Sequence, residues 1–191
     1  DDEIKADAAN YSDYIGERGE NMVPGRNVVK CPYVINEGAN DAYVRIRVMV
    51  PSAANNDFVA VKDGGVITNM WCGTALVGAD GKQPEFQHGD NGTNWPVVTK
   101  GVVKDGVTYD VYTFTRIQPL KAGAMTEWNV WNYIGIDKTA TSADIQKAID
   151  AGAITATGDT MKLNVLVEAD AIQAEGFADA KAAFAAFDAQ A

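Results

Sequence analysis

The segment 42–51, AYVRIRVMVP, alternates strictly between two kinds of side chain, and this pattern constrains the fold more than any other feature of the sequence. One side of the segment is apolar and consists of Ala42, Val44, Ile46, Val48 and Val50. The other side is mixed and consists of Tyr43, Arg45, Arg47 and Met49. Because successive side chains of a strand point to opposite faces, the segment predicts a half-buried β-strand that Pro51 closes.

Further segments have the same β-rich character, and turn residues separate them. They are 26–38, 57–61, 102–117, 126–136 and 161–172. Asp-Gly pairs follow the second segment and lie inside the third, where they favour tight hairpins because they readily supply positive φ. In the last segment one apolar face consists of Met161, Leu163, Val165, Val167 and Ala169. Together these segments predict a mainly β protein, a β-sandwich of jelly-roll type.

Two short helices are expected at the periphery of the sandwich. In segment 141–152, Thr141 is a candidate N-cap with Asp144 three residues later, and Gly152 lies where the helix should end. The apolar stripe of this helix consists of Ile145, Ala148 and Ile149. The alanine-rich segment 176–191 carries a second stripe, which consists of Phe177, Ala180, Phe184 and Phe187. Since an isolated helix of this length is marginal, we expect this stripe to dock on the sandwich.

The remaining stretches lack clear periodicity. Residues 70–94 are rich in Gly, Asn and Asp and predict a long irregular connection, which in a compact domain is usually functional or mobile. The first 25 residues are also polar and irregular. The length of 191 residues predicts a single domain over 20–191 that includes the C-terminal helix, preceded by an N-terminal segment, 1–19.

The charge balance excludes some classes of partner. The formal net charge is −10 at pH 7, so the chain offers no positive field to attract nucleic acid or an anionic membrane surface. No apolar run approaches the roughly 20 residues that a membrane-spanning helix requires. We therefore expect no nucleic-acid partner and no membrane span in the mature chain.

The sequence contains few residues suited to catalysis. His88 is the only histidine, so the His-Glu-x-x-His zinc motif is impossible, and no Gly-x-Ser-x-Gly nucleophile motif occurs. A pair of carboxylates could serve a glycosidase, but 26 acidic residues nominate no particular pair. The chain is therefore predicted not to be an enzyme, with no catalytic residue and no cofactor.

The sequence offers two other candidate sites, one for calcium and one for a sugar. Loop residues that offer oxygen ligands to calcium are Asp80, Asp90, Asn91 and Asn94. Their spacing does not fit an EF-hand, and turns favour Asp and Asn in any case, so no metal is assigned. Aromatic residues that could stack on a sugar are Trp71, Trp95, Trp128 and Trp131. Packing under a loop or helix is the commoner role of such residues.

Cys31 and Cys72 are the only cysteines. They do not form a CxxC pair, and two thiols cannot complete a zinc site without histidine. In an oxidising compartment they could form one disulfide. The alternative is two separately buried cysteines, and the spacing alone leaves both open.

Two stretches resemble a known family. Residues 20–51 contain a Val-Pro-Gly turn, a strand, an Asn-x-Gly turn and then Asp-Ala-Tyr-Val-Arg leading a strand. In this they resemble the front half of the TasA/camelysin family of secreted bacterial matrix proteins. Residues 167–177, VEADAIQAEGF, are similar to the closing strand of that family, where Ala-Ile-Gln-Ala precedes Gly-Phe and a short helix. The two matches bracket about 20–188, and the middle, 52–125, corresponds to variable family territory.

The resemblance implies a jelly-roll domain that is exported by the Sec route and loses its leader, which would account for a sequence that starts at Asp1 and not at Met. It implies an extracellular location at the cell surface or in biofilm matrix, and it favours a Cys31–Cys72 disulfide. It also implies that copies join head to tail into fibres, with other matrix proteins as further partners. In such fibres a segment of one protomer adds as a strand to the sheet of the next, by donor-strand complementation.

The N-terminal segment is our candidate donor strand. Its spaced hydrophobic residues are Ile4, Tyr11, Tyr14 and Ile15. Family members start with a longer apolar strand, so a different donor segment stays open. The alternative function is a secreted adhesin or glycan-binding β-sandwich that uses the 70–95 loop. A camelysin-type metallopeptidase comes third, because a single histidine cannot supply the usual three protein ligands of a catalytic zinc.

Overall fold

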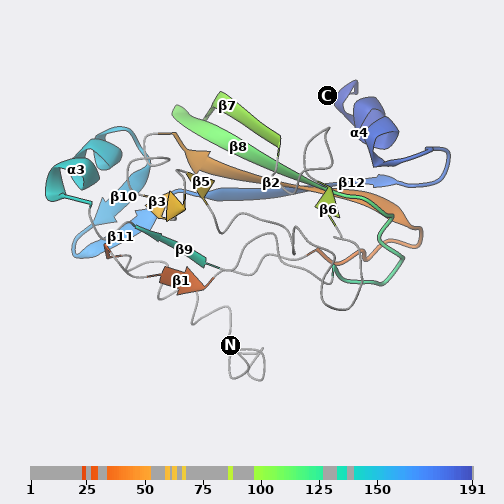
Figure 1. Cartoon of the computed structure of the whole chain (residues 1–191), viewed down its shortest axis with the longest axis horizontal. Helices are drawn as coiled ribbons and strands as arrows, with labels where there is room; N and C mark the ends of the chain where they lie inside the picture. The colour runs from red at the N-terminus through yellow and green to blue at the C-terminus, as the bar shows by residue number, and fades with distance from the viewer. Residues whose placement is uncertain are drawn as a thin grey trace, which may run out of the picture.

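The computed structural model is mainly β, with antiparallel sheets and, among the described residues, two α-helices (Figure 1). The structure describes residues 23–24, 27–29, 34–52, 59–60, 62–63, 66–67, 86–87, 97–126, 133–136 and 140–190. The prediction of a mainly β protein with short peripheral helices is confirmed.

The largest sheet has five strands, and β2 lies between β12 and β8. Both β7 and β6 pair with the other edge of β8, at different points along it. The bounds are β12 (Leu166–Gln173), β2 (Ala42–Pro51), β8 (Val107–Arg116), β6 (Phe86–Gln87) and β7 (Val97–Lys104). All pairs are antiparallel, so neighbouring strands alternate in direction.

Three smaller sheets accompany the large one. In the first, β9 (Tyr133–Ile136) lies between β1 (Asn27–Val29) and β3 (Val59–Ala60). The second is the hairpin of β10 (Ile154–Thr157) and β11 (Thr160–Leu163). The third pairs β4 (Lys62–Asp63) with β5 (Val66–Ile67), which confirms the hairpin expected after 57–61.

The main core lies on one face of the large sheet, here called the inner face. Its fully buried side chains from β2 and β8 are Val44, Ile46, Val48, Val50 and Phe114. Residues that pack on them from other elements are Leu120, Ala148, Ala153, Ile154 and Leu163. Each fully buried aliphatic or aromatic side chain stabilises the fold by about 1.5–3 kcal/mol. Figure 1 shows α3, β10 and β11 gathered at one end of the large sheet and α4 at the other.

Strand β2 is buried on both faces, so the prediction of a half-buried strand is wrong. On the outer face, Tyr43 packs with Phe184 of the C-terminal helix, and Met49 packs with Tyr109 of β8. Arg45, between them, is also buried. The strand is central, and elements distant in sequence cover the face that its own residue pattern predicts to be exposed.

The β7–β8 hairpin confirms the turn predicted within 102–117. Asp105 has a φ of 51° and Gly106 a φ of 80°, the left-handed conformation that a two-residue hairpin of this kind requires. Lys104 pairs with Val107 across the turn. The first strand begins earlier than predicted, at Val97.

The segment 161–172 forms two strands and not one, which corrects the prediction. Strand β11 ends at Leu163, and β12 begins at Leu166 in a different sheet. Asn164 lies at the break, where its backbone N–H donates to Ala153 O at 2.9 Å and its Nδ2 donates to Gly152 O at 2.9 Å. These bonds hold the chain against the start of β10 and end the first strand there.

One correction falls in the stretch expected to be irregular. Within 70–94, residues Phe86–Gln87 form β6 and pair with Arg116 and Thr115 of β8. The partner strand comes from further along the chain, so the local pattern carries no sign of it. The rest of 70–94 lies outside the described residues.

Both predicted helices are confirmed. Helix α3 (Ser142–Asp150) begins with the capping box of Thr141 and Asp144, and Gly152 follows it with a φ of 72°. In α3, Ala148 is fully buried in the main core. Helix α4 (Ala180–Asp188) is shorter than the predicted segment, since Asp179 caps it by accepting a hydrogen bond from Ala182 N at 2.8 Å.

Candidate functional site

The side chains predicted from the sequence to act in assembly or in a disulfide lie outside the described residues. They are Ile4, Tyr11, Tyr14, Ile15, Cys31 and Cys72. The same holds for His88, for the four tryptophans and for the loop residues weighed as calcium ligands. None of the candidate site residues predicted from the sequence therefore takes part in the ion pairs, the sheet edges or the groove of the described part of the chain.

Strand β12 is an edge strand, because among the described residues its only neighbour is β2. The last ladder pair of β12 and β2 is Gln173 with Ala42, and the next residues, Ala174 and Asp41, are hydrogen-bonded. Ala174 N donates to Asp41 O at 2.9 Å, and this bond shows which residues of β12 bond to β2. Bonded and non-bonded pairs alternate along an antiparallel ladder. Residues that bond to β2 are therefore Leu166, Glu168, Asp170 and Ile172. Residues that turn their N–H and C=O groups to the free edge are Val167, Ala169, Ala171 and Gln173.

The outer face of the β2–β12 pair carries a group of ion pairs. In the strand register Arg45 lies opposite Asp170, and Arg47 lies opposite Glu168. Arg45 Nε donates to Asp170 Oδ2 at 2.9 Å, and Arg47 Nη2 donates to Asp170 Oδ1 at 2.9 Å. Glu168 also accepts a hydrogen bond from Lys104 at the tip of the β7–β8 hairpin. Opposite charges directly across two strands favour this register over any slip.

Arg45 also fastens α4 to the sheet. Its Nη1 and Nη2 donate to the two carboxylate oxygens of Asp188 at 2.9 and 2.8 Å, a bidentate pair. The guanidinium carbon lies 4.6 Å from the centre of the Phe184 ring and 5.6 Å from that of Phe187. The hydrogen bond to Asp188 raises the pKa of Arg45, and the same bond lowers the pKa of Asp188. One cation thus joins β2, β12 and the C-terminal helix.

The opposite edge of the large sheet consists of β7 and, at the other end of β8, the short β6. Ser52 N donates to Thr108 O at 2.8 Å, so alternate residues of β8 from Thr108 onward bond to β2 and the others bond to β7. By this alternation Val98 and Val103 turn their backbone groups to the free edge. Val98 is 42% exposed and Val103 is 68% exposed. The register shifts between Thr99 and Val102, which marks a bulge in this strand.

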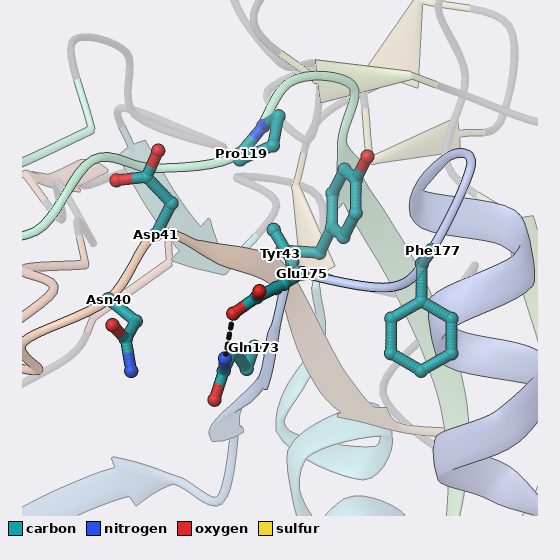
Figure 2. A pocket seen from close by; sticks show the side chains of 8 residues that line it. Asn40, Asp41, Tyr43, Pro119, Gln173, Glu175 and Phe177 are labelled. Atoms are coloured by element: carbon teal, nitrogen blue, oxygen red, sulfur yellow. Dashed lines mark hydrogen bonds between the residues drawn. The ribbon is translucent and has the colours of Figure 1, made fainter.

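An open groove of about 420 Å³ lies beside the end of β12 (Figure 2). Its lining residues are Asn40, Asp41, Tyr43, Pro119, Gln173, Ala174, Glu175 and Phe177. Gln173 Nε2 donates to Glu175 Oε2 at 3.1 Å, the bond dashed in Figure 2. Asp41 accepts from Lys121 Nζ at 2.6 Å and from Ala122 N at 3.2 Å, and the bond from Lys121 lowers its pKa. The groove thus combines amide and carboxylate groups with apolar walls.

Two further findings concern the described part of the chain. None of its helices is both long and apolar enough to cross a membrane. It holds no cluster of three or more His, Cys, Asp or Glu side chains with the geometry to bind a metal ion.

The ion pairs are the main feature that the sequence analysis missed, although a local signal for them exists. The spacing Arg-x-Arg in 45–47 places both cations on one face of a strand, and Glu-x-Asp in 168–170 does the same for two acids. Matching charges on two strands indicate a cross-strand pairing. Neither pattern shows which strands are neighbours. The sequence therefore indicates only that these two charged segments are complementary, and not that they pair.

Comparison with protein-family models, with curated proteins and with solved structures gives no match for this chain. The likeness of 20–51 and 167–177 to the TasA/camelysin family therefore stays a prediction that rests on the quoted residues.

Proposed function

We propose that the protein is an extracellular structural protein of jelly-roll type, whose copies polymerise into biofilm-matrix fibres by donor-strand complementation. The observation that carries the proposal is the large antiparallel sheet. Among the described residues it ends in β12 on one side and in β7 and the short β6 on the other, and each of these strands has one neighbour. An open edge presents unpaired N–H and C=O groups, and a strand from another molecule can satisfy them. The resemblance to secreted matrix proteins points in the same direction.

The donor in this proposal is the segment 1–19 of the next copy. Deleting 1–19 should leave monomers, whereas the full chain should form filaments visible by negative-stain electron microscopy. A variant in which the residues of 1–19 are shuffled keeps the length and charge and serves as the matched control. It should fail to assemble if the order of Ile4, Tyr11, Tyr14 and Ile15 matters. Filaments from the deletion variant would refute the donor role of this segment.

Charge should restrain the assembly. With a net charge of −10, free copies repel one another, and salt at 0.1 M screens that repulsion beyond about 10 Å. Raising the ionic strength or lowering the pH should therefore speed fibre growth, measured by light scattering after dilution from low salt. A growth rate that does not depend on salt would show that charge is not the restraint.

A secreted adhesin or glycan-binding module is the second candidate, and the groove of Figure 2 favours it. Amide and carboxylate groups from Asn40, Gln173 and Glu175 beside an aromatic wall suit a small polar ligand such as a sugar. The same micrographs separate the two functions, because a binding module gives single particles where a matrix protein gives filaments. Glycan-array binding that Glu175→Gln abolishes would support the second candidate.

A further inference from the structure

Among the described residues, the large sheet ends in β12 on one side and in β7 and the short β6 on the other. The β12 and β7 edges differ in how open they are to another strand. Strand β7 carries three features that protect an edge. Its register is broken between Thr99 and Val102, Gly101 within the break has a φ of 76°, and Lys100 and Lys104 lie along it. Bulges and lysines on an edge strand hinder strand addition, because they disturb the ladder and bring charge into the new pair. The β7 edge is therefore poorly suited to accept a partner.

Strand β12 lacks these protections. Its eight residues pair with β2 without any register shift, so its free edge is a regular ladder. The residues that turn their backbone groups outward there include Val167, Ala169 and Ala171, whose side chains are exposed and small or branched. The charged residues of the strand, Glu168 and Asp170, bond to β2 and are held by Arg47 and Arg45. Strand β12 therefore has no bulge like the one in β7.

We infer that the free edge of β12, and not that of β7, accepts an extended segment from a second copy of this chain. This inference rests on the proposed function and specifies its acceptor surface. The partner's segment would form hydrogen bonds with the backbone groups of Val167, Ala169 and Ala171, and it would extend the large sheet to six strands.

The partner's segment is not its own β12. Two β12 edges can pair antiparallel with near-complete overlap in three registers. Glu168 lies opposite the Asp170 of the other copy in the first, Glu168 lies opposite Glu168 in the second, and Asp170 lies opposite Asp170 in the third. Like charges directly across two strands destabilise the pair. The occupant is therefore a different segment of the second copy.

Residues 1–19 of the second copy fit this edge in length and in pattern. Nineteen residues exceed the eight that β12 spans. In IKADAA, residues 4–9, an apolar or small residue stands at every second position, with Lys5 and Asp7 between them. Such a strand would place Ile4, Ala6 and Ala8 beside the small side chains of β12. Lys5 and Asp7 would both lie on the face that carries Glu168 and Asp170, where Lys5 can pair with either acid.

The test is a pair of proline variants, Ala169→Pro and Val98→Pro. Each removes one N–H that points away from the sheet, so each leaves the native ladder bonded, as proline at an edge-strand position permits. Circular dichroism and urea denaturation of the monomers check that both variants fold. We expect Ala169→Pro to lose filaments under conditions where wild type and Val98→Pro form them.

A second measurement does not depend on any variant. Hydrogen exchange in wild-type fibres, dissolved and read by NMR, should show new protection at the amides of Val167, Ala169 and Ala171 relative to the monomer. The amides of Val98 and Val103 should exchange as they do in the monomer.

The outcomes separate the inference from the proposed function. Filaments that form from Ala169→Pro, or new protection at Val98 and Val103 alone, overturn the β12 inference and leave the polymerising function standing. Wild-type protein that never forms filaments overturns both. Loss of filaments in Ala169→Pro together with protection confined to β12 supports the inference.

Discussion

Arg45→Met tests whether a single cation holds the C-terminal helix to the sheet. The substitution keeps a long apolar side chain but removes the charge that contacts Asp170, Asp188 and the Phe184 ring. The Arg45 side chain is only 11% exposed and that of Asp170 only 10%. Removing one partner of a buried ion pair typically costs about 3–5 kcal/mol, because the other charge stays buried without compensation.

Two features of the site lower that figure. Asp188 is 57% exposed, so water can solvate its carboxylate once Arg45 is gone. Asp170 keeps its hydrogen bond from Arg47 at 2.9 Å. The lost cation–π contact adds about 0.5–2 kcal/mol in the other direction. We therefore expect Arg45→Met to lower the free energy of unfolding by about 2–4 kcal/mol.

Urea denaturation measures this change, and amide exchange locates it. Exchange should rise first in α4, residues 180–188, because the lost contacts join that helix to β2 and β12. Asp188→Asn is the matched control and should cost only about 0–1 kcal/mol, as expected for a pair with one exposed partner. If Arg45→Met is no less stable than Asp188→Asn, and α4 exchanges no faster than in wild type, the anchoring role of Arg45 is refuted.

Three further predictions concern acid, the core and a helix cap. Arg45 lowers the pKa of Asp188, so the stabilisation from this carboxylate is complete above the usual aspartate pKa and is lost as the pH falls through the lowered one. The protection factors of the α4 amides, which compare each exchange rate with the intrinsic rate at the same pH, should therefore fall in acid, and Asp188→Asn should lack that component. Phe114→Ala should lower the free energy of unfolding by about 3–5 kcal/mol, because its ring is fully buried, as urea denaturation would measure. Val103→Ala, at an exposed edge position, should change it by less than about 0.5 kcal/mol, and equal losses in the two variants would contradict the core assignment. Thr141→Ala removes the N-cap of α3 and should cost about 0.5–2 kcal/mol, so an unchanged thermal midpoint would argue against the capping box.

The sequence by itself determined the features that depend only on residues adjacent along the chain. The Asp105-Gly106 turn forms because its residues tolerate positive φ, and the α3 cap forms because Thr141 and Asp144 satisfy each other's backbone groups. The alternation of 42–51 fixed which side chains of β2 share a face. Each of these outcomes is decided within a few residues, where local conformation and hydrogen bonding dominate.

Only the tertiary structure decided which faces and edges are covered. The outer face of β2 is buried because α4, more than 130 residues further along the chain, brings Phe184 and Asp188 against Tyr43 and Arg45. The strand predicted over 161–172 breaks at Asn164, because this residue donates hydrogen bonds to the carbonyls of Gly152 and Ala153, just before β10. A period of two shows which side chains point together, but burial depends on what other segments lie opposite. For the same reason the position of β12 at an edge could not be read from its own residues, since among the described residues it depends on which strands lie beside it.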